Sequence, residues 1–168
     1  GANAVPVVIP IGASDTFTGI VDLVTMKALI FNEASQGAEW EEADVPADLL
    51  ETAKKWRNNL VEKCAEQDEE LLEKYFETGD LSEAEIWKIL RKATCARQVV
   101  PVYCGSAFKN KGVQQLLDGV IKILPAPNEI PPIICTKDPE NQRKVDDNEV
   151  FCALAFKIMS DKHMGKLT

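Results

Sequence analysis

The sequence has little of the chemistry that builds a metal centre or a nucleophilic catalytic site. Its 168 residues include one histidine, His163. One imidazole cannot supply the ligands of a zinc site, and no partner for a histidine-based triad is evident. The five cysteines are scattered, with no Cys-x-x-Cys spacing; they are Cys64, Cys95, Cys104, Cys135 and Cys152. We therefore predict reduced thiols in a cytoplasmic protein, with no disulfide framework and no metal site.

Long apolar runs and a phosphate-binding loop are also missing. No apolar run approaches the roughly 20 residues needed to span a bilayer, so no membrane partner is expected. The P-loop pattern Gly-x-x-x-x-Gly-Lys-[Ser/Thr] does not occur in the chain. The paired carboxylates Glu69-Glu70 and Asp146-Asp147 cannot face each other across a pocket, because the first pair is adjacent on a predicted helix and the second lies in a predicted linker. The chain is therefore expected to be inactive as a hydrolase by itself.

Charge of one sign dominates only part of the chain. The formal net charge is −8 overall, but residues 33–85 hold 17 acids and 5 bases. Residues 86–124 hold 7 bases and a single acid, Asp118. This asymmetry predicts one surface that repels RNA and another that tolerates it, with no direct contact to DNA. Solvated helix faces explain any single one of these charges equally well.

The hydrophobic pattern predicts an α+β chain. Residues 5–10 are typical of a strand, residues 19–23 and 26–31 of a hairpin, and residues 38–42 of a short further strand. A helix is predicted to begin at Pro46, with a buried stripe at helical spacing made of Leu49, Ala53, Trp56, Leu60 and Cys64. The helical pattern continues or restarts through Tyr75 until Gly79 stops it.

A second group of elements follows Gly79. The sequence Ser82-Glu83-Ala84-Glu85 is a capping box, which opens a helix through Ala93. Residues 99–104 are predicted as a strand and residues 113–124 as an amphipathic helix. Pro125, Pro127, Pro131 and Pro132, together with many polar residues, mark 125–149 as a linker. Residues 150–159 are predicted as an apolar strand with few partners of its own, and an unpaired strand edge is adhesive. A homodimer formed through this strand is therefore expected.

Residues 104–118 read Cys-Gly-Ser-Ala-Phe-Lys-Asn-Lys-Gly-Val-Gln-Gln-Leu-Leu-Asp and are the most informative stretch. A strand that ends in a small-residue loop before a helix is where α/β folds bind ligands, although many ordinary strand-to-helix turns have the same pattern. The residue sequence of this loop closely resembles the guanine-recognition loop of the translational GTPase elongation factor G. Val5 to Asp22, residues 45–97, Leu124-Pro125-Ala126-Pro127 and Phe151 to Lys157 resemble further segments of that family.

The resemblance implies a fold class and a domain plan. The fold would be α+β, with a helical insert packed on a small β-sheet, the last strand and helix of a P-loop GTPase domain, and the first strand of a β-barrel domain. Residues 1–124 would be the C-terminal part of the GTPase domain, including the insert at about 13–97. Residues 125–149 would be the linker, and residues 150–168 the start of the second domain. We expect an internal piece of a longer protein.

The resemblance also implies site residues and partners. Ser106, Ala107 and Phe108 would form the guanine loop, in which the Ala107 N–H donates to the base carbonyl and Ser106 orders the loop. In this family the phosphate cradle and the Asn-Lys-x-Asp clamp precede the position that matches Gly1. GTP or GDP with Mg²⁺ is therefore expected on the full-length parent, a ribosomal translocase, and no nucleotide is expected on this piece.

A row of acids provides a second candidate site. Glu62, Glu66, Glu69 and Glu73 are spaced to line one face if the helix is continuous, and the neighbouring Lys63 does not neutralise the row. By resemblance, Glu62, Glu66 and Glu69 would meet the C-terminal domain of the ribosomal stalk protein. A solvated helix face is the alternative. For the whole chain, the alternatives are a paralogous ribosomal-protection or release-factor GTPase, or a free-standing acidic interaction module.

Overall fold

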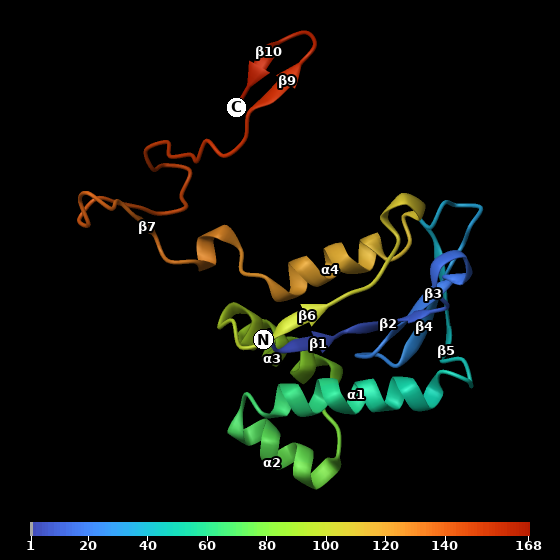
Figure 1. Cartoon of the computed structure of the whole chain (residues 1–168). Coiled ribbons are helices and arrows are strands. Elements are labelled where there is room, and N and C mark those ends of the chain that lie inside the picture. The colour runs from blue at the N-terminus through green and yellow to red at the C-terminus, as the bar shows by residue number, and fades with distance from the viewer. Residues whose placement is uncertain (1) are drawn as a thin grey trace. The chain divides into compact units, whose positions relative to one another are not determined.

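The computed structural model describes residues 2–168 and shows an α+β chain with four α-helices and several small sheets (Figure 1). The chain divides into two compact units, Gly1–Leu124 and Pro125–Thr168. The first unit contains the strands β1 (Ala4–Pro6), β2 (Val8–Ile11), β3 (Gly19–Asp22), β4 (Lys27–Phe31), β5 (Trp40–Asp44) and β6 (Val100–Val102). Its helices are α1 (Leu50–Ala65), α2 (Glu69–Thr78), α3 (Glu83–Cys95) and α4 (Val113–Ile123).

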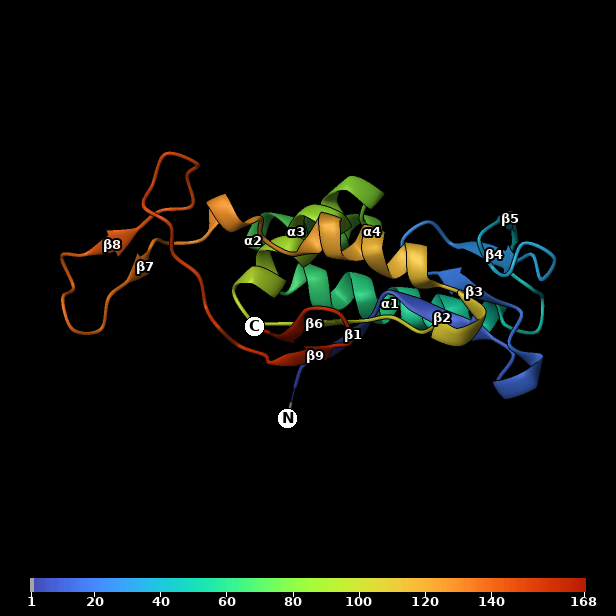
Figure 2. The ribbon, with the colours of Figure 1, turned by 90° about the horizontal axis from the view of Figure 1, so that it is seen from above.

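One extended segment near the N-terminus serves two different sheets. β1 pairs in parallel with β6, whereas β2 pairs antiparallel with β3. Between them, the Val7 N–H donates to the Val102 carbonyl and the Val7 carbonyl accepts from the Leu23 N–H, both at 2.9 Å. Bonds across this pair are made at Asn3 and Val7 and at Val100 and Val102, so Pro6 and Pro101, which have no N–H to donate, lie at positions that do not bond across the ladder. The prediction of one strand over residues 5–10 is therefore wrong, because the chain changes sheet at Val7 (Figure 2).

The antiparallel sheet has the order β2-β3-β4-β5, and the predicted hairpin forms its centre. Alternation along β3 places Ile20 and Val21 on opposite faces, and both are fully buried. Val21 belongs to the main core, while Ile20 packs in a second cluster with Val8, Leu29 and Phe31. Tyr103 and Cys104, which follow β6, pack against this second cluster. The sheet thus links the helical core to the segment that leads into α4.

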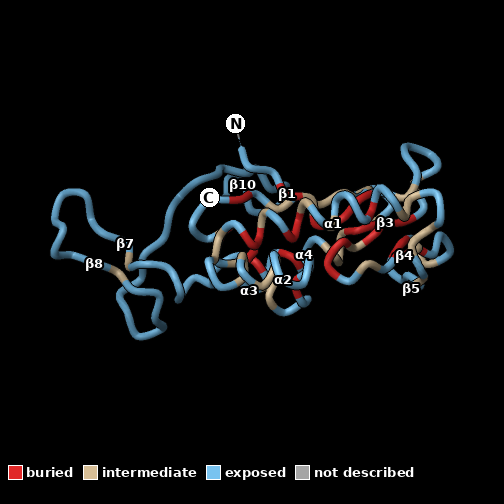
Figure 3. Tube along the Cα trace, turned by 90° about the horizontal axis from the view of Figure 1, so that it is seen from below, coloured by how far each residue is buried: buried red, intermediate tan, exposed pale blue. Residues whose placement is uncertain are grey.

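Helix α1 packs its inner face against α3 and β1. Residues 46–49 form a turn, in which the Leu49 N–H donates to the Pro46 carbonyl, so the helix begins later than predicted. Trp56 was predicted in the core but is 36% exposed. Arg57 points inward instead, with a side chain only 11% exposed. In Figure 1, α1 and α4 lie on opposite sides of the β1–β6 pair, and Figure 3 shows that buried positions follow β1, β3 and α1.

The helical pattern breaks between Glu66 and Asp68. The Gln67 and Asp68 N–H groups close turns onto the end of α1, and Asp68 then has extended backbone with φ −154° before α2 begins. Two later predictions are confirmed. Gly79 ends α2 with φ +75°, and Ser82 and Glu85 form the capping box that opens α3. The break means that the acids from Glu62 onward do not line one continuous helix.

The second unit consists of two short hairpins joined by irregular chain. β7 (Ile133–Ile134) pairs with β8 (Gln142–Arg143), and β9 (Met159–Asp161) pairs with β10 (Gly165–Leu167). The strand predicted over residues 150–159 is absent, since regular pairing begins only at Met159. The physical reason is that an isolated strand has no partner for its backbone N–H and C=O groups, so apolar alternation alone does not form one.

Candidate functional site

The loop between β6 and α4 is closed at its base by a pair of backbone hydrogen bonds. The Ser106 N–H donates to the Lys111 carbonyl at 2.8 Å, and the Lys111 N–H donates to the Ser106 carbonyl at 3.0 Å. The enclosed residues make a single 3-10 turn, Ala107–Lys109, followed by Asn110 with φ +51°. Ser106 therefore orders this loop through its backbone.

Two glycines allow the chain to close this tightly. A Cβ atom on Gly105 would lie 2.6 Å from the Lys111 carbonyl oxygen. A Cβ atom on Gly112 would lie 2.9 Å from the Cys104 carbonyl oxygen, and Gly112 also has φ +80°. Both separations are shorter than carbon and oxygen atoms tolerate without a bond, so any side chain at these positions would open the loop.

The N–H groups at the start of the loop are available to a ligand. Within residues 2–168, no acceptor is bonded to the backbone N–H of Ala107 or Phe108. Ser106 and Ala107 line a shallow hollow of about 270 Å³, together with Pro101, Tyr103, Cys104, Gly105, Lys111, Gly112, Val113 and Leu116. The Phe108 side chain is fully exposed and lines a different hollow. The structure therefore brings two of the three predicted loop residues to one surface and directs the third away from it.

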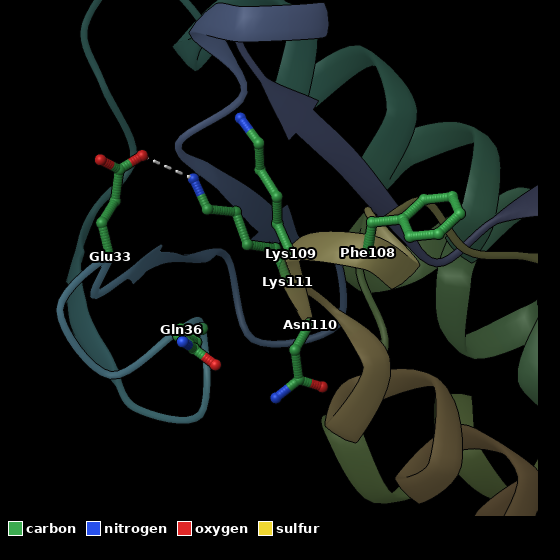
Figure 4. A pocket seen from close by; sticks show the side chains of 7 residues that line it. Glu33, Gln36, Phe108, Lys109, Asn110 and Lys111 are labelled. Carbon is green, nitrogen blue, oxygen red and sulfur yellow. Dashed lines mark hydrogen bonds and ion pairs between the residues drawn. The ribbon is translucent and has the colours of Figure 1, made fainter.

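That second hollow, of about 480 Å³, separates the loop from the segment after β4 (Figure 4). Glu33, Gln36 and Gly37 line one side, and residues 108–111 line the other. Across it, the Lys111 Nζ donates to Glu33 Oε1 at 3.1 Å and to the Phe17 carbonyl at 3.0 Å. The hydrogen bond and charge of Lys111 lower the pKa of the Glu33 carboxyl, and the charge of Lys109 adds to this.

No local feature of the sequence distinguishes Lys111 from the exposed lysines. The pattern Lys109-Asn110-Lys111 presents two lysines in one polar turn, which is typical of a solvated loop. Lys109 is exposed, whereas the Lys111 side chain is 3% exposed. Only tertiary contacts with Phe17 and Glu33, far away in the sequence, distinguish the two.

Cys104 lies beside the loop but has no properties of a nucleophile. Burial raises the pKa of its thiol. Burial also raises the pKa of Tyr103, whose ring lies under Gly119 of α4. A neutral thiol is a poor nucleophile, so the hollow is suited to binding by main-chain donors rather than to covalent chemistry.

The three predicted acidic residues are all exposed, but they do not belong to one helix. Glu62 lies on α1, Glu66 caps its C-terminus, and Glu69 begins α2. Lys63 pairs with one acid of the row, since its Nζ lies 2.8 Å from the Glu66 carboxylate. These residues lie away from the loop between β6 and α4 (Figure 1).

Residues 2–168 contain neither a candidate metal site nor a helix that could span a membrane. There is no cluster of three or more His, Cys, Asp or Glu side chains placed to hold a metal ion. The helices in this range are all too short or too polar to cross a bilayer.

The chain is similar in structure to part of a larger protein. No family model matches the sequence. Among solved structures, the chain is similar to a crystal structure of a protein from Thermus thermophilus, with a TM-score of 0.69 and 26% identity. The match covers 98% of this chain and 22% of that chain. This chain thus spans about a fifth of the length of that protein.

Proposed function

We propose that this chain is part of a translational GTPase that resembles elongation factor G, and that Ser106, Ala107 and Phe108 form its guanine-recognition loop. The observation that carries the proposal is the pair of unbonded N–H groups at Ala107 and Phe108, of which Ala107 lines the hollow beside Gly105 and Ser106. Guanine presents a carbonyl oxygen at the position where adenine presents an amino group. Main-chain donors therefore favour guanine over adenine.

The loop alone supplies only a small part of nucleotide affinity. One such hydrogen bond contributes about 0.5–1.5 kcal/mol, whereas a micromolar complex requires about 8 kcal/mol. Phosphate binding, Mg²⁺ and hydrolysis would belong to parts of the protein outside this chain. We therefore expect millimolar or weaker affinity for GTP and GDP, and no hydrolysis.

The open β1–β6 pair supports the idea of a larger domain. Parallel sheets are normally covered on both faces, and three-residue strands do not form a stable sheet by themselves. Val100 and Val102 of β6 are 48% and 40% exposed, and α4 also exposes apolar side chains: Leu116, Leu117, Val120 and Ile121. In the proposed GTPase, the remaining strands of its sheet would cover this face.

An NMR titration of the ¹⁵N-labelled chain with GMP, IMP and AMP tests the proposal. The three ligands share their sugar and phosphate, and IMP retains the base carbonyl but lacks the exocyclic amine. We expect the Ala107 and Phe108 amide resonances to shift with GMP and IMP at millimolar concentration and to remain in place with AMP. Equal responses to all three nucleotides, or none, would exclude guanine recognition by this loop.

A second proposal is that the acidic insert binds the C-terminal domain of the ribosomal stalk protein. In its favour, Glu62 and Glu69 are exposed and make no ion pair within residues 2–168. A basic partner would be attracted to both carboxylates. Reversal of Glu62, Glu66 and Glu69 to lysine should abolish stalk-induced NMR shifts and leave the fold intact. Shifts that persist in the triple variant would show that these acids are only a solvated surface.

A further inference from the structure

Lys111 is the one charged residue that is buried within residues 2–168, with 2% of its surface exposed. Burying an ammonium group is unfavourable unless hydrogen bonds replace its water. Here the Nζ is satisfied by the Phe17 carbonyl at 3.0 Å and by the Glu33 carboxylate at 3.1 Å. Both partners flank the β3–β4 hairpin, so the contact joins segments that are 94 and 78 residues away from Lys111.

The backbone of the same residue closes the loop. Its N–H and carbonyl are the two groups that pair with Ser106. Lys111 therefore fixes the base of the loop through its main chain and fixes that base to the hairpin through its side chain. The segment after the hairpin also approaches the loop at Gly37, where a Cβ atom would lie 2.6 Å from the Lys109 carbonyl oxygen.

We propose that Lys111 is a positioning residue for the guanine loop. Its ammonium group anchors the loop to the hairpin, so that the Ala107 and Phe108 N–H groups are presented as a fixed pair of donors. The inference rests on the proposed function of this loop. It adds that the insert hairpin, through Phe17 and Glu33, is part of the structure that selects the base.

The test compares three variants of the full chain. Lys111→Met keeps most of the aliphatic stem but removes the ammonium group. Lys109→Met is the matched control, because it removes a lysine two positions away that is exposed. Glu33→Ala removes one acceptor and leaves the Phe17 carbonyl, and it serves as the deciding variant if Lys111→Met does not fold.

Two measurements are made on each variant. The first is amide hydrogen exchange at Ser106 and Lys111, whose N–H groups close the loop. Charged hydrogen bonds are strong enough that Lys111→Met should accelerate this exchange about tenfold. The second is the GMP-against-AMP difference in the Ala107 and Phe108 shifts, which Lys111→Met should abolish, Glu33→Ala should reduce, and Lys109→Met should leave intact. Amide shifts in α1 and α3 report whether the core is unchanged.

The outcomes separate the two proposals. If the wild-type chain discriminates GMP from AMP and Lys111→Met does so equally well, the positioning role is excluded and the guanine loop stands. If the wild-type chain does not discriminate, the guanine assignment fails, and unchanged loop exchange in Lys111→Met and Glu33→Ala would then exclude the anchor as well.

Discussion

At the scale of single residues, two largely buried cations connect distant segments of the first unit through hydrogen bonds. Arg57 and Lys111 both lie in sequence contexts that are typical of solvated surfaces, yet each donates several hydrogen bonds to groups far away in the chain. Arg57 reaches the Leu23 and Leu81 carbonyls and the Asp80 carboxylate. Its planar group provides five donors in a fixed geometry, which suits one side chain that must satisfy several acceptors.

We predict that Arg57→Met destabilises the chain by about 2–4 kcal/mol, because it leaves backbone carbonyls at Leu23, Val24 and Leu81 without a donor. Urea denaturation followed by circular dichroism measures the effect. Lys54→Met is the control, since its pair with Glu51 is exposed and should change stability by less than about 0.5 kcal/mol. If both variants lose the same free energy of unfolding, the buried hydrogen bonds of Arg57 contribute no more to stability than the exposed ion pair of Lys54.

The pKa of the Glu33 carboxyl reports on its ion pair with Lys111. Lys111 lowers its pKa in the folded chain. The stabilising interaction is therefore present above the unfolded-state pKa and is lost as the pH falls through the lower folded-state pKa. We predict that the Glu33 pKa rises in Lys111→Met, as measured by ¹³C NMR of the carboxyl. An unchanged pKa would mean that the ion pair is not formed in solution.

At the scale of elements, local signals located the end of α2 and the start of α3. The capping box at Ser82 is present as predicted, with the Ser82 N–H donating to Glu85 at 2.9 Å. Lys74 and Ser82 together lower the pKa of Glu85 to about 2, so its carboxylate is ionised at neutral pH. The face of α1 was less predictable, because Arg57 and not Trp56 occupies the inward position.

We predict that Ser82→Ala lowers the free energy of unfolding by about 1 kcal/mol, because the Glu85 N–H loses its acceptor at the start of α3. Thermal unfolding at neutral pH measures this loss. Ser82→Thr should retain most of the stability, since its hydroxyl can accept from the Glu85 N–H and donate to the Glu85 carboxylate as serine does. A loss as large in Ser82→Thr would contradict the capping explanation.

At the scale of the whole molecule, stability is concentrated in one of the two units. Every buried hydrophobic residue described lies at or before Ile123. In the second unit, apolar side chains are exposed instead; they include Val150, Phe151, Leu154, Phe156 and Ile158. The predicted homodimer stays a prediction, but its physical basis changes from an open strand edge to this exposed apolar segment.

We predict that a chain that ends at Leu124 unfolds at the same urea midpoint as the full chain, because the truncation removes none of the buried residues. The full chain should associate with rising concentration, whereas the truncated chain should remain monomeric by light scattering. Equal masses at all concentrations would exclude association through residues 150–158. A lower midpoint in the truncated chain would show that the second unit stabilises the first.

Local features of the sequence were sufficient for part of this protein. They predicted the β3–β4 hairpin, the capping box, the stop at Gly79 and the helix after residue 112, because turn chemistry, capping and helical periodicity act within a few residues. Tertiary contacts decided the rest. Val7 changes sheet and Lys111 is buried because their partners are distant in the chain, and residues 150–158 form no strand because no segment of residues 2–168 pairs with them. A backbone donor or a buried charge is satisfied by whatever lies beside it in space, and local sequence spacing does not encode that neighbour.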